Sequence, residues 1–404
     1  MSSAEPELLK KSRERFSDEK IEVQGVQVRR RSSRYRPPKP GSAPAKQQKL
    51  IRKTHSSDRT PAQKEQDQLD EQKSEKLCED IRDCKNPQLL WMQTVLLKNV
   101  NSQMRRFRLL RICTESPSAE CLTTTSDKNA EKNRYADVPC LESSRVVLRG
   151  HVTDYYHANY VALQNGKYFI CAQAPLKFTA EDFWHMVIQE QCRFIVMLCS
   201  FMEEEKEKSS EYFPRCAEKA MIGKFLISVL KRSTRPHGIT ETLLNVKHRS
   251  GSAEVRHLQL TTWPDHSAPL EVDGVLDLYK EVLKYQKSNE NPVLVHCSAG
   301  VGRTCTFVGG LLLMERVFQR DNPSALSVVK EIRKYRYAAV RRATQLLFMQ
   351  YSVMEMFVKD GVMDEDEPQL CVYRAKFLKL VRKINSNKKK GKEMTSEMQQ
   401  SNDK

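Results

Sequence analysis

The sequence predicts an α/β fold in which a mixed β-sheet carries helices on both faces. Short strand-like runs and longer segments of helical periodicity alternate through the middle of the chain, as they do in α/β domains. One strand-like run also passes through a glycine-bearing loop straight into a helix-forming run, within residues 292–318. With 404 residues, the chain can bury one large domain and still have tails.

The first half of the predicted domain alternates between helices and strands. Apolar residues at helical spacing predict helices over residues 89–100 and 181–190. Short apolar runs between polar turns predict strands at residues 146–148, 157–163 and 167–172. The continuous apolar run at residues 193–199 predicts a buried strand.

The second half begins with strands and ends with helices. Runs at residues 225–231, 240–247 and 254–262 predict an antiparallel meander that leads to Trp263. Residues 272–286, 304–319, 324–335 and 343–358 have the apolar spacing of helices. A short apolar strand, residues 292–295, lies between the first two of these helices.

The nine residues that follow this strand carry the clearest chemical signal. They are His296-Cys297-Ser298-Ala299-Gly300-Val301-Gly302-Arg303-Thr304. A strand, a glycine-bearing loop and a helix in that order surround an anion with backbone N–H groups and the positive end of the helix dipole. The Cys-x5-Arg span can wrap a phosphate, with the sulfur below phosphorus and the guanidinium on two oxygens. The same field favours a thiolate, so we expect Cys297 to be an ionised nucleophile near neutral pH.

This strand, loop and helix resemble the signature of the classical protein tyrosine phosphatases, of the non-receptor type. The resemblance covers about residues 85–362 and implies a single catalytic domain with a highly twisted mixed sheet. It implies that Cys297 attacks phosphorus while Arg303 binds the phosphate. The loop residues expected to bind phosphate with it are Ser298, Ala299, Gly300, Val301 and Gly302. His296 would support the loop and Thr304 would hydrogen-bond the sulfur. The alternative is a structural cysteine in an ordinary glycine-rich turn.

Asp265, in the segment Thr262-Trp263-Pro264-Asp265, is the predicted general acid and base. A carboxylate on a loop beside a phosphate site can protonate the departing phenolate. The resemblance implies a mobile loop whose hinge Trp263 anchors. Two positions after the acid, where the family commonly has glycine, this chain has Ser267, and we expect loop closure to be stiffer or slower. In isolation, the same segment is an ordinary turn.

Residues 133–138 resemble the family's phosphotyrosine-recognition loop. Tyr135 would stack on the substrate ring and set a pocket depth that phosphoserine cannot span, and Asp137 would accept an N–H from the substrate backbone. The alternative for Tyr135 is a buried tyrosine in a turn. Glu203 and Lys208 occupy positions where the family has a Glu and a Lys near the site, although a solvated charge run is the alternative.

The hydrolysis step departs from the family pattern. Alignment on Gln345 places a substrate-binding glutamine there, but the water-positioning glutamine four residues earlier is replaced by Arg341. An arginine donates hydrogen bonds and cannot accept them, so it cannot orient water as an amide does. Ala338 takes the place of the small residue that opens the mouth of the pocket. We therefore expect intact cysteine chemistry with slowed turnover, unless Gln345 orients the water instead.

The net charge of +17 is unevenly spread. Residues 23–57 contain ten Lys or Arg and no carboxylate, which predicts a disordered segment. It is either a solvated tail without a specific role, a nuclear-import signal for an import receptor, a tether to an anionic membrane surface, or an RNA contact. No aromatic–glycine pattern of a nucleic-acid module accompanies it, so we predict no specific nucleic acid. Its Arg-Arg-Ser-Ser segment also resembles a kinase substrate.

The twelve cysteines are scattered without a Cys-x-x-Cys pair, which argues against a zinc framework and a secreted disulfide lattice. No apolar run is long enough to span a bilayer, and the first residues lack the apolar core of a signal peptide. We therefore expect a cytoplasmic or nuclear protein that needs no metal or other cofactor. The expected parts are a disordered basic tail (residues 1–76), the phosphatase domain (77–365) and a helical or polar basic tail (366–404, most polar from 385).

These observations favour hydrolysis of phosphotyrosine in proteins, with phosphotyrosine-containing proteins as partners. A phosphotyrosine-binding pseudophosphatase, or a slow enzyme that traps its substrates, is the rival. Cys297, Arg303 and Asp265 argue for the enzyme, whereas Arg341 and Ser267 argue for the rival. A dual-specificity or lipid phosphatase would need a shallower or more basic pocket, which Tyr135 argues against.

Overall fold

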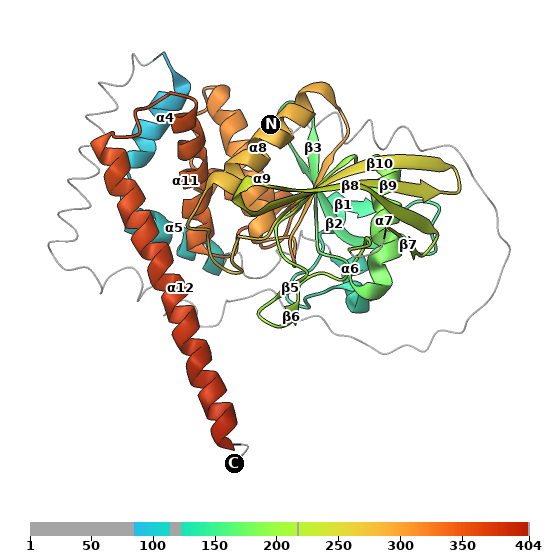
Figure 1. Ribbon diagram of the computed structural model, residues 1–404. Coiled ribbons are helices and arrows are strands. Elements are labelled where there is room, and N and C mark those ends of the chain that lie inside the picture. The colour runs from blue at the N-terminus through green and yellow to red at the C-terminus, as the bar shows by residue number, and fades with distance from the viewer. Residues whose placement is uncertain (1–84, 114–122, 216–217, 403–404) are drawn as a thin grey trace, which may run out of the picture. The chain divides into compact units, whose positions relative to one another are not determined.

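The computed structural model describes residues 85–113, 123–215 and 218–402 (Figure 1). The predicted disordered tail, residues 1–76, lies outside the described residues, so its interpretations stay predictions. In the described part, no helix combines the length and the apolar character needed to cross a membrane.

Within these residues, nine strands form one mixed sheet in the order β1-β2-β3-β11-β4-β10-β9-β8-β7. They are β1 (Arg145–Val147), β2 (Tyr155–Ala162), β3 (Tyr168–Ala172), β4 (Phe194–Met197), β7 (Lys219–Ile222), β8 (Phe225–Arg235), β9 (Ile239–His248), β10 (Gly251–Leu260) and β11 (Val293–His296). A separate hairpin joins β5 (Met202–Glu203) to β6 (Lys206–Glu207). The predicted meander is confirmed, since β8, β9 and β10 pair antiparallel in chain order.

β11 lies in the middle of the sheet and carries the candidate nucleophile at its end. It runs parallel to β3 on one side and to β4 on the other, and all of its residues are buried. A parallel strand that is covered on both faces needs a continuous apolar sequence, which Val293, Leu294 and Val295 provide. Cys297 follows directly, at the carboxyl edge of the parallel strands, where α/β proteins bind their ligands.

Helices flank the sheet, as predicted. They are α4 (Pro87–Leu96), α5 (Val100–Cys113), α6 (Thr124–Lys128), α7 (Ala180–Gln189), α8 (Asp273–Ser288), α9 (Arg303–Phe318), α10 (Ala325–Tyr335), α11 (Ala343–Lys359) and α12 (Pro368–Asn402), with 3-10 turns at Ala130–Lys132, Glu142–Ser144, Lys177–Thr179 and Pro236–Gly238. α9 contacts β3 and β11, α8 contacts β10, and α7 contacts β2. Figure 1 shows α8, α9 and α11 gathered on one side of the sheet and α7 on the other.

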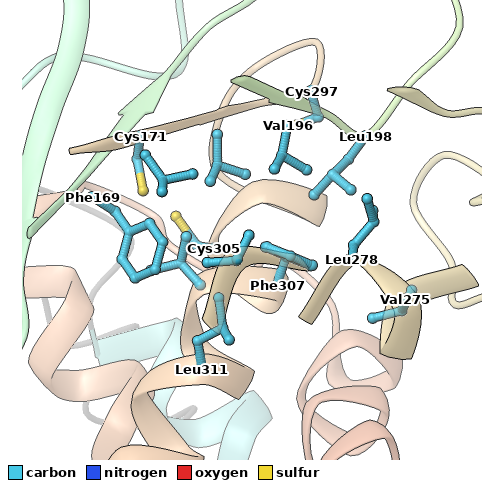
Figure 2. Close-up of a cluster of buried hydrophobic side chains, with 14 of the residues drawn as sticks. Phe169, Cys171, Val196, Leu198, Val275, Leu278, Cys297, Cys305, Phe307 and Leu311 are labelled. Carbon is cyan, nitrogen blue, oxygen red and sulfur yellow. The ribbon is translucent and has the colours of Figure 1, made fainter. Parts of the chain in front are cut away.

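The core beneath Cys297 is a cluster of buried side chains from the sheet and two helices (Figure 2). Cys171 comes from β3, Val196 from β4, Leu278 from α8 and Phe307 from α9, and each is fully buried. Cys297 lies at the edge of this cluster. The strand before it and the helix after it are therefore fixed in a close-packed interior.

The single helix predicted over residues 89–100 is wrong, because α4 ends at Leu96 and α5 begins at Val100. The cause is Asn99, whose side chain accepts a hydrogen bond from Asn101 N at 2.8 Å. Its backbone carbonyl accepts another from Gln103 N. An asparagine that bonds the first amides of a helix favours a new helix start, and the periodicity of the apolar residues does not reveal this.

The segment after residue 365, expected to be a tail, begins with α12, and the first half of this helix packs on the domain. Leu370, Tyr373, Phe377 and Val381 recur every three or four positions and are buried, and α12 contacts α11 and α4. The Phe377 ring stacks on Tyr351 of α11, with 4.5 Å between ring centroids. The packed part of the chain therefore continues beyond the predicted boundary at residue 365. The polar segment predicted from residue 385 is also helical as far as Asn402.

Removal of the Phe377 ring should measure this packing. Phe377→Ala leaves a cavity between α12 and α11 and should lower the free energy of unfolding by about 3 kcal/mol. Val372→Ala, on the same helix but at a side chain that is 52% exposed, should change it by less than about 0.5 kcal/mol. Denaturant unfolding of both variants measures the difference. Two equally small effects would contradict the packing of α12 on the domain.

Candidate active site

Cys297 lies at the floor of a loop that connects β11 to α9. Its side chain is buried, and Gly300 N donates a hydrogen bond to its sulfur, with 3.3 Å between N and Sγ. Arg303, at the other end of the loop, is the first residue of α9. The structure therefore brings together the two ends of the predicted Cys-x5-Arg span, as the sequence indicates.

Every carbonyl between Cys297 and Arg303 is hydrogen-bonded to the scaffold around the loop. The donor–acceptor pairs are Ala174 N to Ser298 O (2.9 Å), Arg336 Nη2 to Ala299 O (3.1 Å), Arg336 Nε to Gly300 O (3.1 Å), Val340 N to Val301 O (2.9 Å) and Thr306 N to Gly302 O (3.0 Å). Because a peptide is planar and its N–H points opposite to its C=O, outward carbonyls turn the amide N–H groups inward. The loop is therefore an anion cradle whose donors are set before a ligand arrives.

Arg336 fixes this cradle from behind, and sequence reasoning did not identify it. The side chain is fully buried. Besides the two loop carbonyls, it bonds Asn159 Oδ1 at 2.7 Å and lies 2.9 Å from His157 Nδ1. No motif marks this arginine, since it lies 33 positions after Arg303 in the chain. Only the order of the strands and helices brings it under the loop.

Gly300 is the one loop residue at which the backbone requires glycine. Its φ is +69°, a region that side chains rarely adopt. A Cβ placed there would lie 2.1 Å from the Ala172 carbonyl oxygen and 2.8 Å from Arg336 Nη2. The loop therefore approaches β3 so closely that only a residue without a side chain fits.

Arg303 is buried and faces two carboxylates. Glu203 binds it in a bidentate pair, with Nη1 to Oε1 at 2.6 Å and Nη2 to Oε2 at 3.1 Å. Nη1 also donates to the Trp263 carbonyl at 3.0 Å, whereas the buried Nε makes no hydrogen bond. A buried cationic donor without an acceptor is costly, and an oxygen of a bound phosphate would satisfy it.

Asp265 is folded onto this site. Its carboxylate lies 3.3 Å from Arg303 Nη2 and 2.7 Å from Lys208 Nζ. Burial alone would raise the pKa of Asp265, but Arg303, Lys208 and His266 outweigh burial and lower it to about 2. Asp265 is therefore ionised at neutral pH while these cations face it. A phosphate dianion on Arg303 would oppose this effect and raise the pKa of Asp265, as a proton donor requires.

Trp263 anchors the acid loop, the segment 263–267, as expected. Its ring is almost fully buried, and its indole N–H donates to the Ser267 carbonyl at 3.1 Å. The ring also packs edge-on against Phe348 of α11, with 4.9 Å between centroids. The two ends of the loop are thus tied to each other and to α11.

His296 contacts the Cys loop as the sequence indicates, whereas Thr304 does not make its predicted bond. Burial lowers the pKa of His296 to about 4, so the ring is neutral; Nδ1 lies 3.1 Å from the Cys297 carbonyl and Nε2 lies 2.8 Å from Tyr212 Oη. His296 thus contacts the loop it was expected to support. The bond predicted from Thr304 to the sulfur is absent, because the buried Thr304 Oγ1 makes no hydrogen bond and Gly300 N is the donor instead.

The predicted recognition loop lies beside the Cys loop. Tyr135 Oη is 2.9 Å from Ser298 Oγ, which places the tyrosine at the edge of the cradle. Asp137 already has a partner, because Arg341 Nη2 binds one oxygen of its exposed carboxylate at 2.6 Å. A substrate backbone would have to share or displace this ion pair.

Gln345 contacts the cradle, but its oxygen is already used. Gln345 Oε1 accepts from Arg341 N at 3.1 Å and from Arg342 N at 3.2 Å. Its amide lies against Gly302, where a Cβ would be 3.0 Å from Nε2. Both lone pairs of the oxygen are therefore occupied, and only the NH2 group remains to contact a water molecule.

Comparison with known proteins gives consistent matches. A family model described as protein-tyrosine phosphatase matches residues 129–355. Mouse tyrosine-protein phosphatase non-receptor type 18 is 35% identical over 240 residues, which are 57% of this chain and 52% of the mouse protein. The human protein of that name is 32% identical over 266 residues, 62% of this chain and 57% of the human one. The chain thus spans about half the length of these curated relatives.

A solved structure agrees with the fold. The crystal structure of the catalytic domain of human protein tyrosine phosphatase non-receptor type 18 superposes with a TM-score of 0.61 at 28% identity. The match covers 68% of this chain and 100% of that domain. The twisted mixed sheet flanked by helices is therefore the fold of that catalytic domain.

Gly300→Ala should disable the cradle. The added methyl group meets the Ala172 carbonyl oxygen, so the loop must shift and its amides lose their alignment. We expect the affinity for vanadate to fall by at least about 100-fold, the cost of losing an oxyanion donor. Gly361→Ala is the control, because Gly361 also has a positive φ of +75° but no neighbour within 4 Å of the added Cβ. Equal vanadate affinity in both variants would contradict this description of the loop.

Proposed function

Because this chain belongs to the protein-tyrosine phosphatase family, we propose that it hydrolyses phosphotyrosine in proteins through a cysteinyl-phosphate intermediate. The observation that supports this best is the Cys297 sulfur at the floor of a loop whose amides face inward. Arg303, across the loop, has a buried N–H without an acceptor. A phosphate ester is the ligand whose charge and shape fit both features.

In the first half of the reaction, the Cys297 thiolate attacks phosphorus and the bond to the tyrosine oxygen breaks. Arg303 and the loop amides stabilise the charge on the equatorial oxygens. Protonated Asp265 gives its proton to the departing phenolate. Lys208, bound to Asp265, and Glu203, bound to Arg303, hold the acid and the guanidinium in place.

In the second half, water attacks the phosphoryl group on the sulfur, and Asp265 accepts the water proton. The thiolate leaves, and inorganic phosphate is released. The attacking water lacks a well-placed acceptor in this step. The Gln345 oxygen already accepts two hydrogen bonds, and the Arg341 side chain binds Asp137. We infer a slow second half, so that the phosphoenzyme accumulates.

The proposed substrates are phosphotyrosine-containing proteins. Tyr135 at the edge of the cradle would set the pocket depth, and a solved structure at 28% identity is titled as non-receptor type 18 in complex with HER2 phosphopeptides. The proposed site of action is the cytoplasm or nucleus, which suits a reactive thiolate. A membrane surface or an import receptor remains the proposed partner of residues 23–57.

The rival function is a phosphotyrosine-binding pseudophosphatase, which the Arg341–Asp137 ion pair favours. That pair engages the carboxylate that is expected to accept an N–H from the substrate backbone. The enzyme and the rival differ in a single observable, the release of phosphate.

Release of phosphate from a phosphotyrosine peptide and from an aryl phosphate tests the proposal. Wild type should release it, Cys297→Ser should not, and Asp265→Asn should lower kcat by about 10²- to 10⁴-fold. In wild type, the rate of the phenol burst should fall as pH rises above the pKa of Asp265 in the complex, because the acid loses its proton. An amide does not titrate, so Asp265→Asn should lack this loss. Tight peptide binding without release by wild type would establish the rival.

Arg341→Gln tests the inferred slow step. Wild type should release a rapid burst of phenol, about one per active site, before a slower steady state. The variant frees Asp137 and supplies an amide that can orient water, so the steady state should accelerate and the burst should shrink. Arg342→Gln, at the exposed neighbour, is the control and should resemble wild type. A wild type without a burst would contradict the slow second half.

A further inference from the structure

The acid loop has a partner on α12, far away in the sequence. Ser267 Oγ donates a hydrogen bond to Asn385 Oδ1 at 2.7 Å, across 118 positions of the chain. Ser267 is fully buried, and Asn385 is half-buried. A buried hydroxyl needs an acceptor, and α12 provides it.

A second path joins the same two elements through aromatic rings. Phe377 of α12 packs on Phe348 of α11, with 6.3 Å between centroids, and Phe348 packs on Trp263. α12 is itself fastened to α11 by a bidentate ion pair between Arg374 and Glu355, at 2.7 and 2.8 Å. The acid loop therefore rests on α12 directly through Ser267 and indirectly through Trp263.

The two partners of the direct bond come from separate parts of the chain. Ser267 stands where the resembling family commonly has glycine, which could make no such bond. Asn385 lies outside the segment matched by the family model, residues 129–355. A donor added to the loop thus meets an acceptor on a helix beyond the matched domain.

We propose that Asn385 is a positioning residue that holds the acid loop folded over the Cys loop. In this position Asp265 lies 3.3 Å from Arg303, where it can reach a leaving oxygen. The proposal rests on the proposed phosphatase function, because it assigns a role in delivery of the Asp265 proton. Without Asn385, the hydroxyl of Ser267 loses its buried acceptor and the loop spends more time away from the site.

Loss of the Ser267–Asn385 hydrogen bond should slow one step selectively, the protonation of the leaving group. A poor leaving group needs the proton of Asp265, whereas a good leaving group departs nearly as well without it. Phosphate binding depends on Arg303 and the amides, which Asn385 does not touch. The effect therefore falls on the single-turnover rate of phenol release for poor leaving groups and leaves the affinity for phosphate unchanged.

The experiment compares full-length Asn385→Ala with Ser386→Ala. Ser386 is the exposed neighbour whose hydroxyl bonds only its own helix, at Arg382 O. Because a buried hydrogen bond is lost, the single-turnover rate of phenol release should fall about fivefold for phenyl phosphate in Asn385→Ala. It should change less than about twofold for 4-nitrophenyl phosphate, whose leaving group is better. Ser386→Ala should match wild type on both, and Asn385→Asp, which keeps an acceptor oxygen, should recover the single-turnover rate for phenyl phosphate.

Ser267→Gly completes the test, because in that background Asn385→Ala should have no further effect. An equal loss of the single-turnover rate on both esters, or a loss that persists in the Ser267→Gly background, would overturn the positioning role. An active wild type with an unchanged Asn385→Ala would overturn it as well. A wild type inactive on both esters would instead refute the proposed phosphatase function.

Discussion

The buried guanidinium of Arg336 sets the direction of the peptides that surround the candidate nucleophile. It draws the Ala299 and Gly300 carbonyls outward, and the amides of the loop turn inward as a consequence. This arrangement is possible only because Gly300 lies against β3 without a side chain. The anion cradle is therefore built by the packing of β3, β11 and the segment before α11, and not by the loop sequence alone.

Arg303 connects the cradle with the acid loop, because protein oxygens and a bound phosphate compete for its guanidinium. Glu203, the Trp263 carbonyl and Asp265 all face its guanidinium. In the absence of substrate, this cation keeps Asp265 ionised, and a bound dianion would relieve it. The contact that holds Asp265 near the site thus keeps this carboxylate deprotonated until a phosphate binds. The position of the acid loop and the pKa of Asp265 therefore both depend on the occupancy of Arg303.

Functional residues that share one short segment could be predicted from the sequence. Residues whose role depends on partners far away in the chain could not. Cys297 and Arg303 belong to one loop. Glu203 contacts Arg303 and Lys208 contacts Asp265, so both lie near the site, as their family positions indicate. Arg336 and Asn385 carry no motif, because their partners lie more than 30 positions away. The helix break at Asn99 could not be predicted from apolar periodicity, because a side-chain hydrogen bond of Asn99 starts the second helix. The packing of α12 was missed because its polar composition masks a narrow apolar stripe.

If the cradle works as described, one sulfur carries the phosphoryl group during turnover. The decisive measurement is a rapid quench in alkaline denaturant, where the S–P bond persists, of the protein with a ³²P-labelled phosphotyrosine peptide, followed by peptide mapping. Label should appear on Cys297 within the first turnover, approaching one phosphate per chain, and none should appear in Cys297→Ser. Free phosphate that appears in the first turnover without any labelled cysteine would contradict this role of Cys297.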